Sequence, residues 1–481
     1  MSDLLRAWII DQRWYAAKGT ELAELTRIGG VRLGGSGSAD VHVEIHVVRT
    51  VTADGTASIY QVPLTYRARP EPALAHAELG VFSHPELGEQ YVYDAPHDPV
   101  FVEALLHLLD GGRTGSVEGS VGGAAGGSVG WGPAAGRAIG VMQRVGAPRV
   151  EAPRVARSRV LSGEQSNTSI IVGADGPDPI IVKLFRVLHA GSNPDVILQT
   201  RLAAAGCDRV PRPVGWVEGS WSLGPDGPLV EGHLAYACEF VTDGDDAWRV
   251  ACRAVEDDAS FVTQAYGLGL ATAEVHGVLA RALPTVPADA AALTRLADGL
   301  VGRVRWAVGL VPTLEPFAAA SLAVVDAVRT IADAPALQRI HGDYHLGQVL
   351  HSPGRGWILL DFEGEPLRPL AERLEPDLAL RDVAGMLRSF DYAARHATVT
   401  LDGDDPRSVA AHEWSGRARE AFLAGYTAGG GRINGESGGS HAALLRALEI
   451  DKALYEVVYE SLNRPDWVDV PLSALRRFVA G

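Results

Sequence analysis

The sequence has few cysteines and no long apolar run. Cys207, Cys238 and Cys252 stand alone among 481 residues and show no paired spacing, so neither a disulfide framework nor a zinc site is expected from them. Arg, Asp or Gly interrupts every apolar stretch, and none reaches the roughly 18 residues that a bilayer span needs. The N-terminus lacks the basic start, apolar core and cleavage site of a signal peptide, so a cytoplasmic protein is expected.

Positive charge is also scarce. The 59 acidic residues outnumber the 43 basic ones and give a formal net charge of −16. This excess argues against nucleic acid or an anionic membrane as the main partner and favours a small molecule. Lys18, Lys183 and Lys452 are the only lysines. An ammonium is a compact point charge, so a lysine in an arginine-rich protein can mark a site that needs one.

The length predicts two or three domains. Residues 1–108 combine an amphipathic helix with alternating strands and predict a small α+β cap. The glycine-rich stretch 109–137 predicts a mobile loop, because its residues offer little apolar area to offset backbone entropy. Residues 138–243 predict a second sheet lobe. Residues 244–481 have helical periodicity and predict a helical lobe.

Two polar motifs in the helical part carry the chemistry. RIHGDYHLGQVL contains Asp343 and Gln348, and WILLDFEGEP delivers Asp361 at the end of a short apolar run. This spacing matches the protein-kinase pattern H-x-D-x-x-x-x-N followed by D-F-G, here with Gln for Asn and with D-F-E-G. In that pattern the first Asp accepts a hydroxyl proton, while the amide and the second Asp hold magnesium. His341 and His345 are expected to hold the loop by hydrogen bonds.

The candidate nucleotide site lies upstream. Lys183 occupies an alternating strand position in IIVKLFR, as expected for a lysine that binds phosphate. The following helix offers Asp195 and Gln199 but no interior Glu, so the group that orients Lys183 stays open. The strand ending in CEFVT predicts a hinge in which Glu239 and Val241 pair with adenine. The loop expected to cover the phosphates contributes Gln165, Ser166, Asn167 and Thr168.

QRIHGDYHLGQVL, DFEGEP, LEIDKALYEVVYESLNRPDW, VKLFR and the opening QRWYAAKG resemble actinobacterial maltokinases and glucosamine kinases over nearly the whole chain. These enzymes are similar to aminoglycoside phosphotransferases and protein kinases. The resemblance implies a bilobal α+β, kinase-like fold with an N-terminal cap, and ATP and Mg²⁺ as cofactors. It implies Asp343 as catalytic base, Lys183 as phosphate ligand, and Gln348 and Asp361, helped by Glu363, as magnesium ligands.

The acceptor is expected to be a sugar. The glycine-rich insertion, Tyr344 and the EPDLALRD segment depart from maltokinases and favour the glucosamine kinase branch, whose members phosphorylate the primary 6-hydroxyl rather than an anomeric hydroxyl. Maltose, another amino sugar or an aminoglycoside stay as alternatives. The cationic amine of glucosamine would suit an acidic pocket.

A sugar site needs aromatic faces and hydrogen-bonding groups near Asp343. Tyr455 and Tyr459, and likewise Glu456 and Glu460, are four residues apart and share a helix face. Trp414, near the start of another expected helix, could close the pocket. Alternatively, the tyrosines belong to the core and the glutamates face solvent. These candidates for the acceptor site are Tyr455, Glu456, Tyr459, Glu460 and Trp414.

The leading hypothesis is therefore an ATP- and Mg²⁺-dependent sugar kinase, which works by positioning and charge neutralisation. It is expected to act as a monomer with a small-molecule partner, without nucleic acid or membrane. Arg381 and Asp382 are expected to brace the catalytic loop. The alternative from another class is a kinase-like regulator that binds nucleotide without turnover, which Gln348 in place of Asn would favour and the intact Asp343 and Asp361 oppose.

Overall fold

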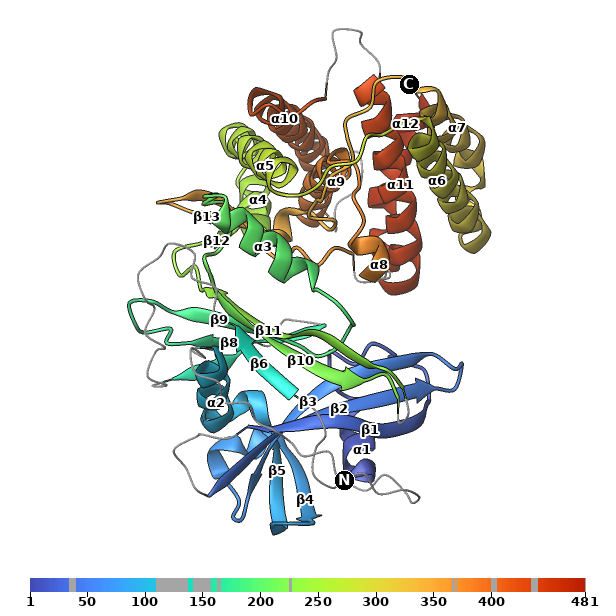
Figure 1. The fold of residues 1–481 in the computed structure, drawn as a ribbon. Coiled ribbons are helices and arrows are strands. Elements are labelled where there is room, and N and C mark those ends of the chain that lie inside the picture. The colour runs from blue at the N-terminus through green and yellow to red at the C-terminus, as the bar shows by residue number, and fades with distance from the viewer. Residues whose placement is uncertain are drawn as a thin grey trace. The chain divides into compact units, whose positions relative to one another are not determined.

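The computed structural model describes residues 1–33, 40–109, 137–141, 157–161, 166–224, 227–365, 368, 370–398, 405–433 and 440–480. Within these residues the chain forms two compact units (Figure 1). The first unit comprises residues 1–196 and 212–242, and the second comprises 197–211 and 243–481. The predicted glycine-rich loop lies, apart from its two end residues, outside the described residues.

The first unit opens with a five-stranded antiparallel sheet in the order β1-β2-β3-β5-β4. Its strands are β1 (Leu22–Leu33), β2 (Val41–Thr52), β3 (Ala57–Arg67), β4 (Glu78–His84) and β5 (Gly88–Asp94), and helix α1 (Ser2–Ile9) precedes them. Apolar side chains of β2 enter two different apolar clusters, because successive side chains of a strand point to opposite faces of the sheet. Val43, Ile45 and Val47 join one apolar cluster, while Val48 joins a second cluster with Leu5 of α1.

A six-stranded antiparallel sheet in the order β6-β10-β11-β9-β8-β7 completes the first unit. Its strands are β6 (Arg137–Val141), β7 (Ser158–Val160), β8 (Asn167–Val172), β9 (Ile180–Phe185), β10 (Pro213–Ser222) and β11 (Leu229–Glu239). Helix α2 (Pro99–Leu109) shares one core with both sheets. The fully buried Arg186 pairs with Asp94 at 2.9 Å and so joins the chain after β9 to the end of β5. Helix α3 (Pro194–Ala204) begins in this unit.

The second unit is mainly helical around one large core. Its helices are α4 (Ala247–Glu256), α5 (Val262–Ala282), α6 (Ala290–Leu310), α7 (Glu315–Asp326), α8 (Leu370–Arg373), α9 (Leu380–His396), α10 (Pro406–Ala428), α11 (Ser440–Asn463) and α12 (Asp469–Ala480). A small sheet consists of β12 (Asp245–Asp246), β13 (Val349–Ser352) and β14 (Gly356–Leu359). The short 3-10 helices of the chain are Pro72–Ala77, Ala95–His97, Pro312–Leu314, Ala327–Thr330, Leu346–Gln348 and Pro465–Trp467.

Local sequence explains where several of these helices begin. Asp246, Asp289 and Asp405 precede α4, α6 and α10, and each side chain accepts a hydrogen bond from a backbone N–H of the first turn, as N-caps do.

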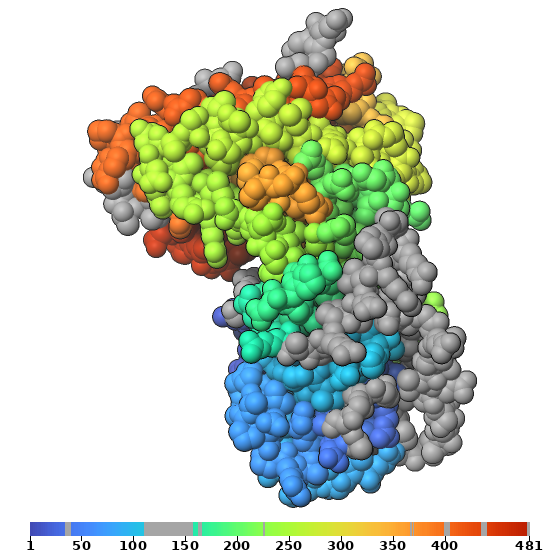
Figure 2. Space-filling model, turned by 90° about the vertical axis from the view of Figure 1, so that its left-hand side faces the viewer, coloured from blue at the N-terminus to red at the C-terminus, as the bar shows by residue number. Residues whose placement is uncertain are grey.

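The hairpin β13–β14 packs against α4 and α5, and its tip reaches the surface among them (Figure 2). The α+β class is thus confirmed. Within the described residues no helix is long and apolar enough to cross a membrane.

Helices α5 and α10 approach each other at glycine positions. A Cβ atom on Gly425 would lie 2.0 Å from the carbonyl oxygen of Tyr266, and one on Gly269 would lie 2.1 Å from that of Phe422. Real Cβ atoms do not come this close to a backbone oxygen, so both positions require glycine for close helix packing. Gly302 in α6 has open space around its Cα instead.

We predict opposite effects for alanine at these two kinds of position. Gly425→Ala should destabilise the protein by at least about 1–3 kcal/mol, because the backbones of α5 and α10 must separate. Gly302→Ala should stabilise it by about 0.5–1 kcal/mol, because alanine loses less backbone entropy in a helix. Urea unfolding of both variants measures the difference. A Gly425→Ala protein as stable as the parent would contradict the close packing.

Candidate active site

A buried carboxylate on α9 holds the loop that carries Asp343. Asp382 is 2% exposed. Its two oxygens accept hydrogen bonds from the backbone N–H groups of His341 and Gly342 at 2.8 and 2.9 Å, and His276 Nε2 lies 3.0 Å away. Burial opposes ionisation of Asp382, but the hydrogen bond from His276 and its neighbouring charges hold the pKa of Asp382 below its usual value. The loop is therefore anchored through its backbone, which leaves the Asp343 side chain for other contacts.

The two histidines of the loop make local hydrogen bonds. His341 Nε2 donates to the carbonyl oxygen of Leu360 at 2.7 Å and thereby ties the Asp343 loop to the residue before Asp361. His345 Nδ1 accepts from the N–H of Gly347. Burial lowers the pKa of His345, so its neutral form prevails near pH 7. Both contacts fit a positioning role rather than proton transfer.

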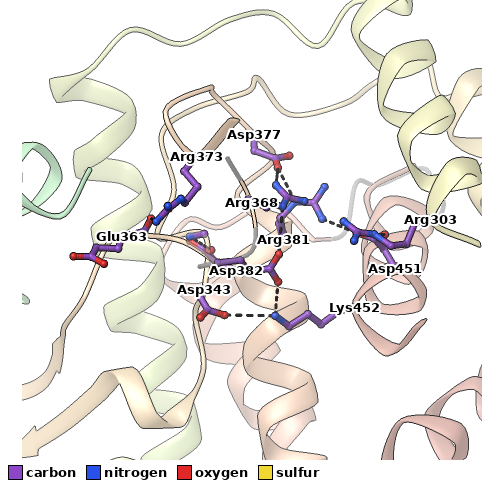
Figure 3. Close-up of polar contacts among 12 residues, drawn as sticks. Arg303, Asp343, Glu363, Arg368, Arg373, Asp377, Arg381, Asp382, Asp451 and Lys452 are labelled. Atoms are coloured by element: carbon purple, nitrogen blue, oxygen red, sulfur yellow. Dashed lines mark hydrogen bonds and ion pairs between the residues drawn. The ribbon is translucent and has the colours of Figure 1, made fainter. Parts of the chain in front are cut away.

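Gln348 and Asp361 come together at the end of the β13–β14 hairpin. Leu360 donates its N–H to the carbonyl oxygen of Gln348, and Gln348 Nε2 donates to Asp361 Oδ2 at 3.2 Å. Asp361 has a φ of +58°, a left-handed conformation that costs energy in a residue other than glycine and recurs at functional sites. The pair presents an amide oxygen and carboxylate oxygens, which are the hard ligands that magnesium prefers. Glu363 points away from Asp343 (Figure 3).

Lys452 of α11 connects Asp343 to a second acid. Its Nζ lies 3.5 Å from Asp343 Oδ1 and 2.6 Å from Glu365 Oε1. Burial disfavours the ammonium, but the Glu365 and Asp343 carboxylates raise the pKa of Lys452 above its usual range. Burial likewise opposes ionisation of Glu365, yet Lys452 and Arg368 lower its pKa to about 2. Lys452 and Glu365 are therefore both charged near neutral pH.

Alternating charges extend from this pair along one wall of the pocket (Figure 3). Arg368 contacts Glu365 at 3.3 Å and Asp377 at 3.7 Å, and Arg381 contacts Asp377 at 2.6 Å. Asp451 of α11 then accepts from Arg381 at 2.9 Å and from Arg303 of α6 at 3.3 Å. Each carboxylate of this wall contacts at least one cation. The pocket is lined by Arg303, Gly342, Asp343, Tyr344, Glu365, Arg381, Asp382, Gly385, Leu448, Asp451, Lys452 and Tyr455.

The aromatic candidates divide between pocket and surface. Tyr455 lines the pocket, with Lys452 Nζ 5.5 Å and Arg303 Cζ 5.7 Å from its ring centre. Tyr459 stacks on Tyr455 with ring centres 6.5 Å apart and is 39% exposed. The two rings form a continuous aromatic face on α11, as their spacing predicts. Such a face can carry the apolar side of a sugar ring.

The other three acceptor candidates have different partners. Glu456 pairs with Arg388 at 2.8 Å, and Glu460 pairs with Arg464 at 2.7 Å. Both glutamates are at least nine-tenths buried. Trp414 lies inside α10 rather than near its start, is 3% exposed, and donates to the carbonyl oxygen of Ala259. These residues stabilise helix packing and do not line the Asp343 pocket, because tertiary contacts rather than helix spacing decide which face is buried.

In the first unit, Lys183 of β9 has an acidic partner. Its Nζ donates to Asp195 Oδ2 at 3.2 Å, and Asp195 is 2% exposed at the start of α3. Asn193 Oδ1 accepts from the N–H of Asp195 and fixes this turn. Asp195 therefore orients Lys183, the role that sequence reasoning left open. An aspartate in the first turn of the helix takes the place of the interior glutamate that a protein kinase would use.

The remaining nucleotide candidates are placed less uniformly. Thr168 Oγ1 accepts from Arg186 Nε at 2.8 Å, which links it to the buried Arg186–Asp94 pair. Asn167 is 8% exposed, whereas Ser166 is exposed. Glu239 at the end of β11 donates its N–H to the carbonyl oxygen of Arg212, and its carboxylate pairs with the Arg212 guanidinium at 3.0 Å. Val241, the other hinge candidate, is half-buried.

Sequence reasoning missed Lys452, Glu365 and Arg303 as pocket residues. Lys452 carried a signal, since it is one of three lysines in the chain. Glu365 is the last residue of the DFEGE stretch, but no sequence spacing predicts that it contacts α11, which begins 75 residues later. Arg303 resembles the other arginines of α6 in sequence. Only the packing of α6 against α11 brings it to the pocket.

Two family models match the chain. The maltokinase N-terminal cap domain matches residues 8–98, and the phosphotransferase enzyme family matches residues 157–434. The glucosamine kinase of Mycolicibacterium smegmatis is 30% identical over 329 residues, which cover 66% of this chain and 78% of the relative. The glucosamine kinase of Streptacidiphilus jiangxiensis is 30% identical over 331 residues, which cover 66% and 72%. The resemblance that the motifs indicated is thus confirmed.

Solved structures confirm the fold over the full length. A glucosamine kinase in complex with glucosamine, ADP and inorganic phosphate matches with a TM-score of 0.63 and 21% identity and covers 99% of both chains. A crystal form B of glucosamine kinase matches with a TM-score of 0.66 and 21% identity, over 100% of this chain and 99% of that one. The predicted kinase-like fold with an N-terminal cap is therefore confirmed.

The low pKa of Glu365 predicts how stability depends on pH. The folded pKa of about 2 lies below that of an unfolded glutamate, roughly 4.3. The ion pair with Lys452 therefore stabilises the fold fully above about pH 5 and is lost as the pH falls toward 2. Glu365→Gln should lower the free energy of unfolding by up to about 3 kcal/mol at pH 6.5 and by about 2 kcal/mol at pH 3.5. Thermal unfolding of both proteins across this range measures the effect.

Glu413→Gln serves as the control, because the exposed Glu413 makes only a 3.7 Å pair with Arg417. It should change stability little at either pH. A Glu365→Gln deficit of equal size at pH 6.5 and 3.5 would contradict the lowered pKa.

Proposed function

Since this chain belongs to the phosphotransferase enzyme family, in the branch with a maltokinase-type cap that includes glucosamine kinases, we propose that it phosphorylates glucosamine on the 6-hydroxyl with ATP. The observation that carries the proposal is the pocket in which Lys452 contacts both Asp343 and Glu365 beside Tyr455. It combines a candidate base, fixed charges and an aromatic face, which are the parts that a sugar acceptor site requires.

In this proposal Asp343 accepts the proton of the acceptor hydroxyl as the phosphoryl group is transferred. Lys452 Nζ lies 3.5 Å from Asp343 Oδ1 and helps to hold this side chain in the pocket. Asp382 fixes the backbone of the loop, so Asp343 needs little reorganisation before reaction. Positioning of this kind supplies a large part of the catalysis in phosphoryl transfer.

The nucleotide half of the reaction is assigned to other residues. The Asp195-oriented Lys183 would contact the phosphates. Gln348 and Asp361 would hold Mg²⁺, because an amide oxygen and carboxylate oxygens suit this ion and the two side chains are in contact, with Gln348 Nε2 donating to Asp361 Oδ2. When bound, the ion neutralises the charge that develops on the phosphoryl oxygens. Gln in place of the usual Asn keeps the amide oxygen on a side chain one methylene longer.

Amine recognition is assigned to the pocket carboxylates Asp343, Glu365 and Asp451, in place of the helix-packing Glu456 and Glu460. An ammonium gains a charge-assisted hydrogen bond there that a neutral hydroxyl cannot match. The surrounding cations limit this preference, since Lys452 already pairs with Glu365, and Arg303 and Arg381 already pair with Asp451. Discrimination against glucose should therefore be moderate.

Maltose is the second candidate acceptor, because the match of residues 8–98 is to a maltokinase cap. A maltokinase would phosphorylate an anomeric hydroxyl. The position of the phosphate in the product therefore separates the two functions as clearly as the choice of acceptor.

A coupled assay of ATP consumption with glucosamine, N-acetylglucosamine, glucose, maltose and kanamycin tests the acceptor. We expect kcat/KM for glucosamine to exceed that for glucose by about ten- to a hundredfold, from one charge-assisted hydrogen bond. N-acetylglucosamine should be poor, because acetylation removes the charge at that atom. Phosphorus NMR should find glucosamine 6-phosphate.

Asp343→Asn is the control for contaminating kinases and should lose at least about a hundredfold in kcat. A preference for maltose with an anomeric phosphate would favour the maltokinase function. ATP binding without consumption over the whole panel would favour the regulator.

The three lysines form a matched set that separates the two halves of the proposed site. Lys183→Met should raise the KM for ATP by about tenfold or more, since a phosphate contact is lost. Lys452→Met should instead act on glucosamine turnover and leave ATP binding close to the parent value. Lys18→Met is the control, because Lys18 is exposed and donates to the carbonyl oxygen of Ile10, which belongs to neither half of the site. Steady-state kinetics with each substrate varied, together with ATP titration calorimetry, distinguish the three outcomes.

A further inference from the structure

A cluster of imidazoles surrounds one carboxylate in the first sheet, apart from the residues of the proposed transfer reaction. His42, Glu44 and His46 alternate along β2 and so share one face of that strand. His84 ends β4 and reaches the same place. The four side chains are each at least nine-tenths buried. Strands β2 and β4 are not neighbours in the sheet order β1-β2-β3-β5-β4, so the cluster joins strands that share no backbone hydrogen bonds.

Two imidazoles converge on one oxygen of Glu44. His42 Nε2 lies 2.7 Å from Glu44 Oε1, and His84 Nε2 lies 3.8 Å from the same oxygen. The first distance is a short hydrogen bond, whereas the second is too long for one. The ligand atoms that His42, Glu44 and His84 can offer all lie within 4.8 Å of one another. This is the range within which three side chains can share one cation.

His46 supports the cluster from the second carboxylate oxygen. Its Nδ1 accepts from Arg27 Nε at 2.9 Å, so its Nε2 carries the proton. That nitrogen lies 2.7 Å from the hydroxyl of Tyr66 and 3.2 Å from Glu44 Oε2. His46 is therefore hydrogen-bonded through both ring nitrogens, to Arg27 and Tyr66, lies beside the second carboxylate oxygen, and is not available as a ligand.

We propose that His42 Nε2, Glu44 and His84 Nε2 bind a divalent transition metal ion, zinc above all. Two imidazole nitrogens and one carboxylate are a typical zinc ligand set, with water in the fourth position. Metal bonds of about 2.0–2.2 Å in tetrahedral geometry place ligand atoms roughly 3.3 Å apart. The 2.7 Å pair would open and the 3.8 Å pair would close, each by about half an ångström. Nitrogen ligands exclude magnesium and calcium, which take oxygen.

Binding requires a change of proton position at both histidines. The N–H of Glu86 donates to His84 Nδ1 at 3.2 Å, so His84 carries its proton on Nε2 without metal. Coordination through Nε2 moves that proton to Nδ1 and ends the hydrogen bond from Glu86. His42 gives up its hydrogen bond to Glu44 at the same time and loses its Nε2 proton or shifts it to Nδ1. The bound ion would cross-link β2 to β4 and so hold β4, which is an edge strand of the sheet, in place.

Cobalt and zinc binding to the full-length protein test this proposal. After EDTA treatment and dialysis, we expect one equivalent of Co²⁺ to give the intense visible absorption of a tetrahedral site and to be displaced by one equivalent of Zn²⁺. X-ray absorption of the zinc form should show two imidazoles and two oxygen ligands. Zinc should raise the Tm by several degrees, whereas Mg²⁺ should not change it.

Two variants locate the ion. His84→Asn removes the ligating nitrogen but keeps an acceptor for the Glu86 N–H, so it preserves the turn. It should weaken zinc binding at least about a hundredfold. The double variant His76→Asn, His97→Asn is the matched control. It removes the other close histidine pair of the cap, whose rings approach to 3.2 Å at the surface, and should retain the site.

Loss of the cobalt spectrum in the control and its retention in His84→Asn would place the ion at the surface pair and overturn the proposal. Absence of stoichiometric binding to the parent protein would overturn it as well. The X-ray absorption result stands on the parent protein alone and decides the ligand set even where a variant fails to fold. Because none of these readouts depends on catalysis, failure here is distinguishable from failure of the proposed kinase function.

Discussion

Asp382 is the residue on which the geometry of the active site depends. It is an ionised carboxylate buried in the helical core, and such a group is tolerated only where donors replace its hydration. Two backbone N–H groups of the Asp343 loop and one histidine supply those donors. The dependence is mutual. The carboxylate needs the N–H groups of the loop as donors, and the loop needs the carboxylate to hold its conformation. Gly385, one turn further along α9, permits this contact, since a Cβ there would lie 2.5 Å from the carbonyl oxygen of Tyr344.

Charge compensation shapes the rest of the pocket. The chain carries a net charge of −16, yet the wall beside Asp343 alternates acids with Lys452 and arginines. Burying carboxylates near a site for phosphate chemistry would otherwise repel the nucleotide and raise their pKa values. The alternation keeps Glu365 and Lys452 charged while the local sum stays small.

The motifs and their order could be interpreted from the sequence because short-range spacing carries them. The Asp343 loop and the DFEGEP segment are each contiguous, and a hairpin of two short strands must bring their ends together. The structure joins Gln348 to Asp361 at that hairpin. The acceptor wall could not be predicted in the same way. Glu456 and Glu460 have the same helical spacing as Tyr455 and Tyr459, and only the packing of α9 and α12 against α11 shows which stripe is buried.

The sequence by itself determined the α+β class, the cap followed by a sheet lobe and a helical lobe, and the loops that carry Asp343 and Asp361, since periodicity and contiguous motifs are local properties. Tertiary structure decided which charges meet. Lys183 on a strand contacts Asp195 on a helix, and Lys452 contacts Asp343, which lies 109 residues earlier in the chain. His84 lies near Glu44 although their strands do not pair. Such contacts depend on how elements pack, and packing is set by the sum of many weak apolar contacts that no single spacing records.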